Sequence, residues 1–288
     1  MLMRKMIRAA APFLERAVVV IVAFVFSAGG AVAEPIEVVV NGQTRTAIVE
    51  RSAGAERQPT VIMLHGSGGE AAGLGKITGL PRLAQQQGFV AVFPQGGWNF
   101  LPPDFKPPDG RQLPDDAAFL KMLIAELVRL RISDPERVYL SGFSLGGFMA
   151  LRMICMEPGP FAGVALFSAA MPELVGDRCR PTKPIPFLLR QSTGDQLVPY
   201  EGGRLGRSGL PVWSAERLVA FFRAHNGCAN AGKQTVAFQQ SSKVEIEYAT
   251  TCSGAPVVNY RIVGGGHSIP WMDISRLLWL FFSGKLVT

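Results

Sequence analysis

The stretch RVYLSGFSLGGFMAL, residues 137–151, decides the fold prediction, because an apolar run, a serine between two glycines and a second apolar run follow one another directly. The first run has the composition of a buried strand, and the second is typical of a helix. Small neighbours such as Gly142 and Gly146 allow a sharp turn that lifts the Ser144 hydroxyl clear of the backbone. The stretch predicts a strand, a tight turn and a helix, with Ser144 as a nucleophile or as a helix cap.

On both sides of this stretch, segments typical of strands alternate with segments typical of helices. Two alternating apolar runs around Asn41-Gly42, within residues 36–50, indicate an antiparallel hairpin. Strands are expected at 60–66, 89–96, 137–142, 163–169, 185–192 and 257–266, and helices at 80–87, 115–131, 146–155, 214–225 and 274–282. A glycine-rich loop is expected at 66–75 and a proline-rich loop at 98–114. This alternation predicts an α/β fold with a mostly parallel sheet, helices on both faces, and ligands at the carboxyl ends of the strands.

The amino-terminal segment is typical of a secretory signal peptide. A basic leader precedes an apolar run at 17–26, and Ala31-Val32-Ala33 supplies small residues for cleavage. We expect cleavage after Ala33 and a secreted protein, extracellular or periplasmic, without stable membrane insertion afterwards. An uncleaved amphipathic anchor is the alternative. Residues 34–288, 288 − 33 = 255 in number, suffice for one domain.

The charge pattern argues against binding to nucleic acid. The formal net charge is +7, and the leader, with four basic residues and one acidic one, accounts for +3 of it. The remaining +4 is scattered, without a block of Lys or Arg and without an interleaved aromatic stripe.

Four cysteines, all in the expected secreted portion, favour disulfides over a zinc site, because none is arranged as CxxC. Four cysteines allow three connectivities. We favour the pairing of sequence neighbours, Cys155 with Cys179 and Cys228 with Cys252, since each loop then encloses one segment. One bridge with two buried free thiols is the alternative.

A nucleophilic serine needs a base, and the chain offers three histidines. His225 lies in the last turn of an expected helix, where contacts with terminal carbonyls are common, and His65 precedes the glycine-rich loop. His267 follows the last expected strand and alone comes late enough for the chain order Ser, Asp/Glu, His. Asp195, after the strand 185–192, is the best orienting acid, with a simple turn role as its alternative.

Acyl transfer also requires donors for a developing oxyanion. The backbone N–H of Leu145, directly after the serine, is one candidate, and Ser67 or Gly68 in HGSGG would supply the other. His65 is expected to support the shape of that loop by hydrogen bonding.

These motifs resemble the secreted α/β-hydrolase esterases that include polyhydroxybutyrate depolymerase-like proteins and the feruloyl and acetylxylan esterases of carbohydrate esterase family one. The matching stretches are LHGSGG, DDAAFL, SGFSLGGFMA, GDQLVPYEGG, NGC and GGGHSIPW. The resemblance implies the α/β-hydrolase fold, a triad of Ser144, Asp195 and His267, and the two local cysteine bridges.

The chain also departs from the family pattern. Gln191-Ser192 stands where such proteins tend to carry His-Gly, and Ile269 stands where a tryptophan often follows the catalytic histidine, with Trp271 displaced. In the proline-rich loop, Trp98, Phe100 and Phe105 are candidates either for the wall of an acyl pocket or for satellite core. These differences bear on the choice of substrate.

The sequence therefore predicts a serine esterase that forms an acyl-enzyme, with no metal and no organic cofactor. Its substrate would be a polyhydroxyalkanoate, a polysaccharide-linked ester or a small ester. A base must be neutral to work, so activity is expected to fall at acid pH. The rival interpretations are a serine peptidase of the same fold and a noncatalytic binding protein on a hydrolase scaffold.

Overall fold

The computed structural model describes residues 31–157, 159–206, 208–229, 232–237, 243–268 and 273–286. Most of the expected signal segment, residues 1–30, lies outside this part, as do Ile269 and Trp271. In the described ranges, no helix is long and apolar enough to cross a membrane.

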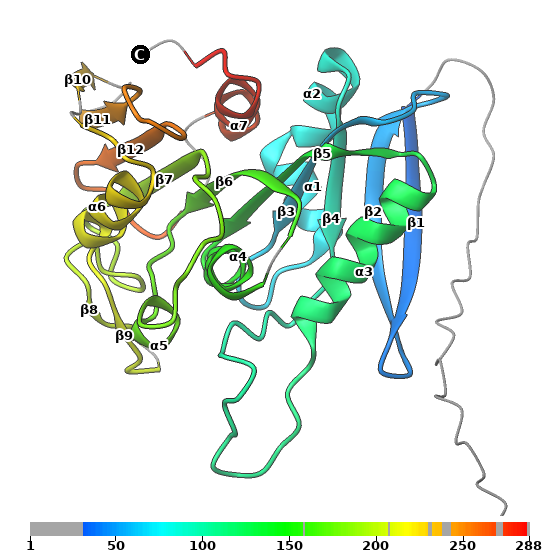
Figure 1. The fold of residues 1–288 in the computed structure, drawn as a ribbon, viewed down its shortest axis with the longest axis horizontal. Helices are drawn as coiled ribbons and strands as arrows, with labels where there is room; N and C mark the ends of the chain where they lie inside the picture. Colours follow the sequence, from blue (N-terminus) through cyan, green and yellow to red (C-terminus); the bar gives the residue numbers. More distant parts are fainter. Residues whose placement is uncertain are drawn as a thin grey trace, which may run out of the picture.

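A single large sheet forms the centre of the described chain (Figure 1). Its strands lie in the order β1-β2-β4-β3-β5-β6-β7-β12-β11-β10. Their bounds are β1 Ala31–Val40, β2 Gln43–Ser52, β3 Gln58–Leu64, β4 Val90–Pro94, β5 Ser133–Phe143, β6 Phe161–Phe167, β7 Phe187–Ser192, β10 Gly232–Ala237, β11 Lys243–Ala249 and β12 Val257–Ile262. A separate small hairpin pairs β8, Gly203–Arg204, with β9, Pro211–Val212.

The strands from β4 to β12 in this order are parallel, and antiparallel strands flank them at both edges. At one edge β1 and β2 form the predicted hairpin, with Val40 paired to Gln43 and positive φ at Asn41 and Gly42. The predicted fold is thus confirmed. The sequence analysis missed β10 and β11 at the other edge, although KVEIEYA in β11 alternates polar and apolar residues as half-buried strands do.

Helices cover both faces of the sheet. They are α1 Ala71–Thr78, α2 Leu80–Gln87, α3 Asp116–Arg129, α4 Leu145–Met156, α5 Glu173–Gly176, α6 Ala215–His225 and α7 Ile274–Phe282. The first of them occupies part of the stretch expected to be a glycine-rich loop. Its buried residues recur at helical spacing, and they are Ala71, Leu74, Gly75 and Thr78.

Two apolar layers result, one on each face of the sheet. Helices α3, α4 and α6 pack on one face and α1, α2 and α7 on the other. Successive residues of β3 alternate between the layers: Ile62 belongs to the first and Met63 to the second. Because the central strands are parallel, the loops that leave β5, β7 and β12 meet at one edge, and these loops carry the candidate site residues.

Candidate active site

Ser144 occupies the turn between β5 and α4 in a strained backbone conformation, with φ 53° and ψ −120°. Close packing enforces this turn. A Cβ on Gly142 would lie 2.3 Å from the carbonyl oxygen of Gly146, and one on Gly146 would lie 2.4 Å from the carbonyl oxygen of Leu64. Ser144 stands at the N-cap position of α4, but its side chain makes no capping hydrogen bond to the helix, so the hydroxyl is left for another partner.

The Ser144 hydroxyl instead faces His267. Its Oγ lies 2.9 Å from His267 Nε2, and His267 Nδ1 lies 2.8 Å from Asp195 Oδ2. Since a carboxylate can only accept, we assign the imidazole proton to Nδ1, which leaves Nε2 to accept from the serine. The structure therefore brings the three predicted side chains together in the predicted order.

The two carboxylate oxygens of Asp195 make different contacts. Asp195 is 3 % exposed, and its Oδ1 accepts from the backbone N–H groups of Leu197 and Val198, both at 2.9 Å, as a turn residue does. Its Oδ2 faces His267 Nδ1. The turn interpretation therefore accounts for one oxygen, and the other is placed as an orienting acid requires.

Hydrogen bonds join the loop that carries Asp195 to the loop that carries His267. Thr193 N donates to the Ile262 carbonyl at 2.9 Å, and Gly194 N donates to the Gly264 carbonyl at 3.1 Å. In return, Gly264 N donates to Thr193 Oγ1 at 2.9 Å. The acid and the base therefore lie on one connected pair of loops.

The loop HGSGG lies directly beside the serine. A Cβ on Gly66 would approach Ser144 Cβ to 3.4 Å. The Gly66 carbonyl accepts from Gly69 N at 3.0 Å and lies 2.8 Å from His65 Nδ1. Because a trans peptide points its N–H opposite to its C=O, these bonds turn the Ser67 N–H away from them. Gly68, with φ 68°, completes the turn.

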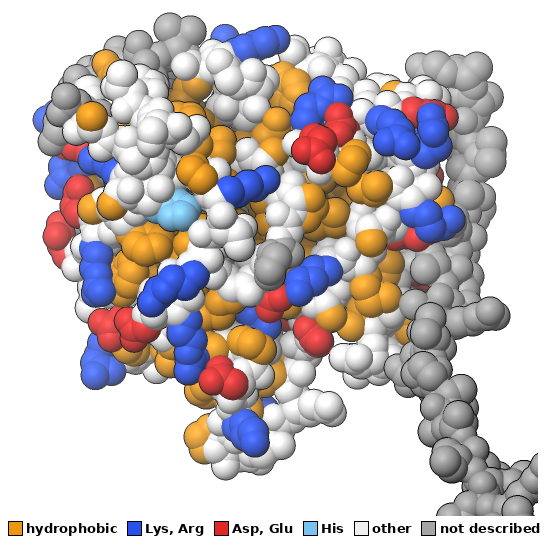
Figure 2. All heavy atoms as spheres, viewed as in Figure 1, with side chains coloured by type: hydrophobic (Ala, Val, Ile, Leu, Met, Phe, Trp, Pro, Cys, Tyr) orange, Lys and Arg blue, Asp and Glu red, His pale blue; other side chains and the backbone are white. Residues whose placement is uncertain are grey.

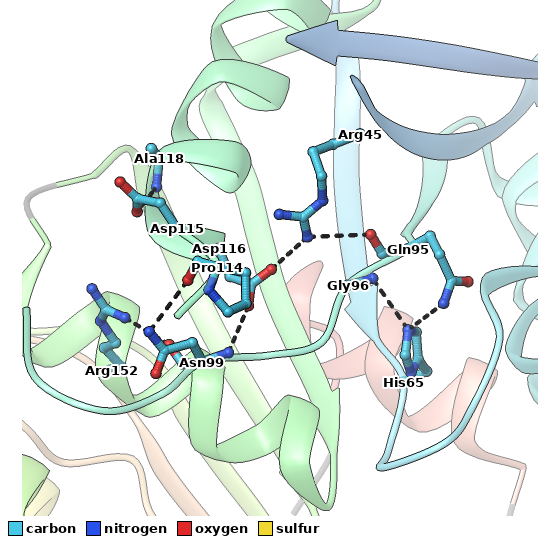
Figure 3. Close-up of polar contacts among 10 residues, drawn as sticks. All are labelled: Arg45, His65, Gln95, Gly96, Asn99, Pro114, Asp115, Asp116, Ala118 and Arg152. Atoms are coloured by element: carbon cyan, nitrogen blue, oxygen red, sulfur yellow. Dashed lines mark hydrogen bonds and ion pairs between the residues drawn. The ribbon is translucent and has the colours of Figure 1, made fainter. Parts of the chain in front are cut away.

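His65 supports this loop as expected, and Gln95 is a partner that the sequence analysis missed (Figure 3). His65 Nε2 lies 3.3 Å from Gln95 Nε2 and accepts from Gly96 N at 3.4 Å. The Gln95 oxygen accepts from Ala71 N at 2.8 Å, so this amide ties the loop to the start of α1. The only sequence signal was a polar residue at the end of a buried strand.

His225, the remaining histidine, makes a structural contact with the backbone. His225 Nε2 is 3.0 Å from the Lys183 carbonyl oxygen. This carbonyl belongs to the chain before β7 rather than to the end of its own helix, which is where contacts were expected.

Two disulfides join cysteines of the described chain, and they are the favoured pairs. Cys155 with Cys179 is buried between α4 and the segment after α5, and Cys228 with Cys252 bridges the ends of the segment that holds β10 and β11. The alternative with two free thiols is wrong.

The aromatic candidates of the proline-rich loop have different environments. Trp98 is 2 % exposed and packs 5.1 Å from the His65 ring, so it is core. Phe100 is partly buried and packs against Phe148 at the edge of the core. Phe105 is 37 % exposed and lines an open pocket of about 440 Å³ between the loop, Asn41 and Arg152.

Buried polar groups anchor the start of this loop (Figure 3). Asn99 N donates to buried Asp116, which also pairs with Arg45, and Arg152 donates to the Asn99 carbonyl at 2.6 Å. The loop is therefore fixed to β2, α3 and α4 rather than lying free over the site.

Two buried polar residues of β7 support the loops of the site. Gln191, one of the departures from the family pattern, donates from its Nε2 to the Val198 carbonyl at 2.6 Å and so holds the Asp195 loop. Arg190, which the sequence analysis also missed, is fully buried on the opposite face of β7 and donates to the Ser268 carbonyl at 2.8 Å. A charged residue inside an apolar strand was the signal for it.

Comparisons with known proteins agree with this geometry. The chain is 33 % identical to a putative esterase of Nocardia uniformis subsp. tsuyamanensis over 81 % of this chain and 73 % of that protein. It is 31 % identical to feruloyl esterase B of Piromyces equi over 54 % of this chain, but spans only 29 % of that longer protein.

The solved structure of an acetyl xylan esterase from Aspergillus awamori shares the fold. Its TM-score is 0.57 at 14 % identity, over 82 % of this chain and 94 % of that one. The family model of phospholipases and carboxylesterases matches residues 44–210, more than half of the chain. The chain therefore belongs to the phospholipase/carboxylesterase family of α/β-hydrolases, and it is an esterase of the serine hydrolase class.

Proposed function

We propose that this protein is a secreted serine esterase that works through an acyl-enzyme on Ser144. The observation that carries the proposal is the hydrogen-bonded series from Ser144 Oγ through His267 to Asp195, at 2.9 and 2.8 Å. In this arrangement His267 Nε2 takes the serine proton as Oγ attacks the ester carbonyl, and Asp195 stabilises the imidazolium that forms.

The developing oxyanion would be bound by backbone N–H groups. Leu145 is the first residue of α4, so its N–H has no partner within the helix, and the helix amino end favours negative charge there. Ser67, whose N–H is turned away from the Gly66 carbonyl, would supply the second donor, and Gly68 lies on the same turn. His267 then protonates the leaving alcohol and activates water for deacylation.

Ser144→Ala tests the proposal. Loss of the nucleophile is expected to lower kcat on a short-chain nitrophenyl ester by about a million-fold, with an unchanged melting temperature. Ser141→Ala is the matched control. Ser141 is buried in β5, the strand that leads to Ser144, and its hydroxyl makes no hydrogen bond among the described residues. This control should keep wild-type kcat. Retention of activity by Ser144→Ala would contradict the proposal.

The proposal also includes a substrate class, which is taken from the similar proteins. Feruloyl and acetyl xylan esterases among the similar proteins favour an ester carried by a plant polysaccharide. A panel of methyl ferulate, acetylated xylan and solid polyhydroxybutyrate ranks the substrate classes by kcat/KM. A preference for polyhydroxybutyrate would overturn the polysaccharide assignment, and faster cleavage of a matched amide would favour the peptidase.

Secretion is supported by the signal-like leader and by the two disulfides. Cleavage after Ala33 would shorten β1 by three residues and leave its pairing from Glu34 with Val49 onward. Mass spectrometry of the exported protein should find Glu34 as its first residue, and an intact amino terminus would refute the cleavage.

A further inference from the structure

Arg190 is a fully buried arginine beneath the candidate site. It lies on β7 opposite Phe167 of β6 and Tyr260 of β12, on the face of the sheet that α7 covers. Burying a cation is costly unless hydrogen bonds and nearby charge compensate for it. An apolar residue at this position would avoid that cost, so we expect Arg190 to have a role that depends on its charge or its hydrogen bonds.

The contacts of Arg190 lead to the loop of His267. Its Nη1 donates to the Ser268 carbonyl oxygen at 2.8 Å and lies 3.5 Å from Ser168 Oγ. Ser268 directly follows His267, and Ser268 N closes a tight turn around the histidine by donating to the Gly266 carbonyl at 3.0 Å. Arg190 thus holds the backbone on the carboxyl side of His267.

The other side of the same loop is held independently. There, Gly264 exchanges hydrogen bonds with Thr193 and Gly194, as described above. His267 is therefore clamped between a backbone anchor before it and the Arg190 guanidinium after it.

Arg190 also brings a positive charge close to Asp195. Burial lowers the pKa of Arg190 to about 10, an effect that the charge of Asp195 opposes, so the guanidinium stays protonated at neutral pH.

We propose that Arg190 is a positioning residue of the esterase, which fixes the loop of His267 through the Ser268 carbonyl. The inference rests on the proposed function, because Arg190 acts through the Ser144–His267 pair.

Arg190→Met tests this role, because methionine keeps much of the volume and removes the hydrogen-bond donor. The readout is the rate at which a fluorophosphonate modifies Ser144, measured by intact mass. This rate depends on activation of the serine by His267 and requires no knowledge of the natural ester. We expect modification to slow by between about 10- and 100-fold.

Two further variants separate positioning from general stability. Arg190→Lys keeps a donor and the charge but not the planar fork, so it should react several-fold more slowly than the wild type but faster than Arg190→Met, and it carries the test if Arg190→Met does not fold. Arg152→Met removes another buried arginine that donates to a loop carbonyl, that of Asn99, and should lower the melting temperature without slowing the modification of Ser144.

A wild-type rate of modification in Arg190→Met overturns the role of Arg190, and so does an equal loss of rate in Arg152→Met. Failure of the wild-type protein to react, or reaction of Ser144→Ala at the same rate, overturns the proposed function instead.

Discussion

The serine side of the site is held by backbone packed against backbone, whereas the histidine side is held by hydrogen bonds between two loops. On the serine side, a single added carbon at Gly142 or Gly146 would overlap main-chain atoms at 2.3 to 2.4 Å. On the histidine side, Thr193, Gly194 and Gly264 exchange donors and acceptors at 2.9 to 3.1 Å, partly in contact with solvent.

This difference predicts two kinds of response to mutation. Overlap with main-chain atoms cannot be relieved by a rotamer change. A side chain added at Gly142 or Gly146, which flank Ser144 at the turn, therefore forces the backbone to move and destabilises the fold. A hydrogen bond near solvent can be replaced by water, so the loss of one bond on the histidine side costs little. The exception is the carboxylate itself, which has a chemical role as well as a structural one.

Asp195→Asn is expected to have the largest effect of the substitutions that compare the two sides of the site. Asparagine can still accept from the amides of Leu197 and Val198, but its NH₂ group would face His267 Nδ1. The imidazole would then carry its proton on Nε2 and could not accept from Ser144, which should lower kcat by about 10⁴-fold. Steady-state kinetics on a nitrophenyl ester measures this.

The matched control for that variant is Asp115→Asn. Asp115 caps α3 by accepting from Ala118 N at 3.0 Å, and asparagine caps helices equally well, so kcat should not change. A loss below tenfold in Asp195→Asn would show that the carboxylate does not set the tautomer.

Gly146→Ala should break the serine side through stability. The new Cβ would lie 2.4 Å from the Leu64 carbonyl oxygen and 2.6 Å from that of His65, so β3 and α4 must move apart. We expect the free energy of unfolding to fall by about 3 kcal/mol, as measured by urea denaturation.

Gly73→Ala provides the contrast within the same chain. Gly73 lies in α1 with no atom within 4 Å of an added Cβ, so alanine should raise the free energy of unfolding by about 0.5 to 1 kcal/mol. Equal effects of the two substitutions would refute the claim that backbone overlap holds the elbow.

The same contrast explains what the sequence predicted and what it missed. The elbow is local, so the strand, the turn and the helix are all visible in residues 137–151. The order of Ser144, Asp195 and His267 required only that each follow a strand of a parallel sheet, and the structure brings these side chains into contact.

The supports of the site were not predictable in this way. Gln95 reaches His65 across 30 residues, and Arg190 reaches Ser268 across 78, so each bond exists only after the sheet has formed. A polar or charged residue in a buried strand signals that a partner is needed, but it does not identify that partner. The edge strand β10, GKQTVA, was missed because it has no alternation of polar and apolar residues, and β11 because its alternation is a weaker signal than the apolar runs of the central strands.

Of the three substitutions made at the site itself, Thr193→Val should have the smallest effect, and it is the sharpest test of the histidine side. Valine keeps the shape of threonine but removes the Oγ1 that accepts from Gly264 N at 2.9 Å. Thr193 N still donates to Ile262 and Gly194 N to Gly264, so the two loops stay joined. Water can reach the freed Gly264 N–H, which limits the expected cost to about 1 kcal/mol in unfolding free energy. The loss in kcat should be under about fivefold, measured by urea denaturation and ester hydrolysis on the same preparation. A loss in kcat approaching that of Asp195→Asn would mean that His267 depends on this one bond, and the distinction between the two sides of the site would then fail.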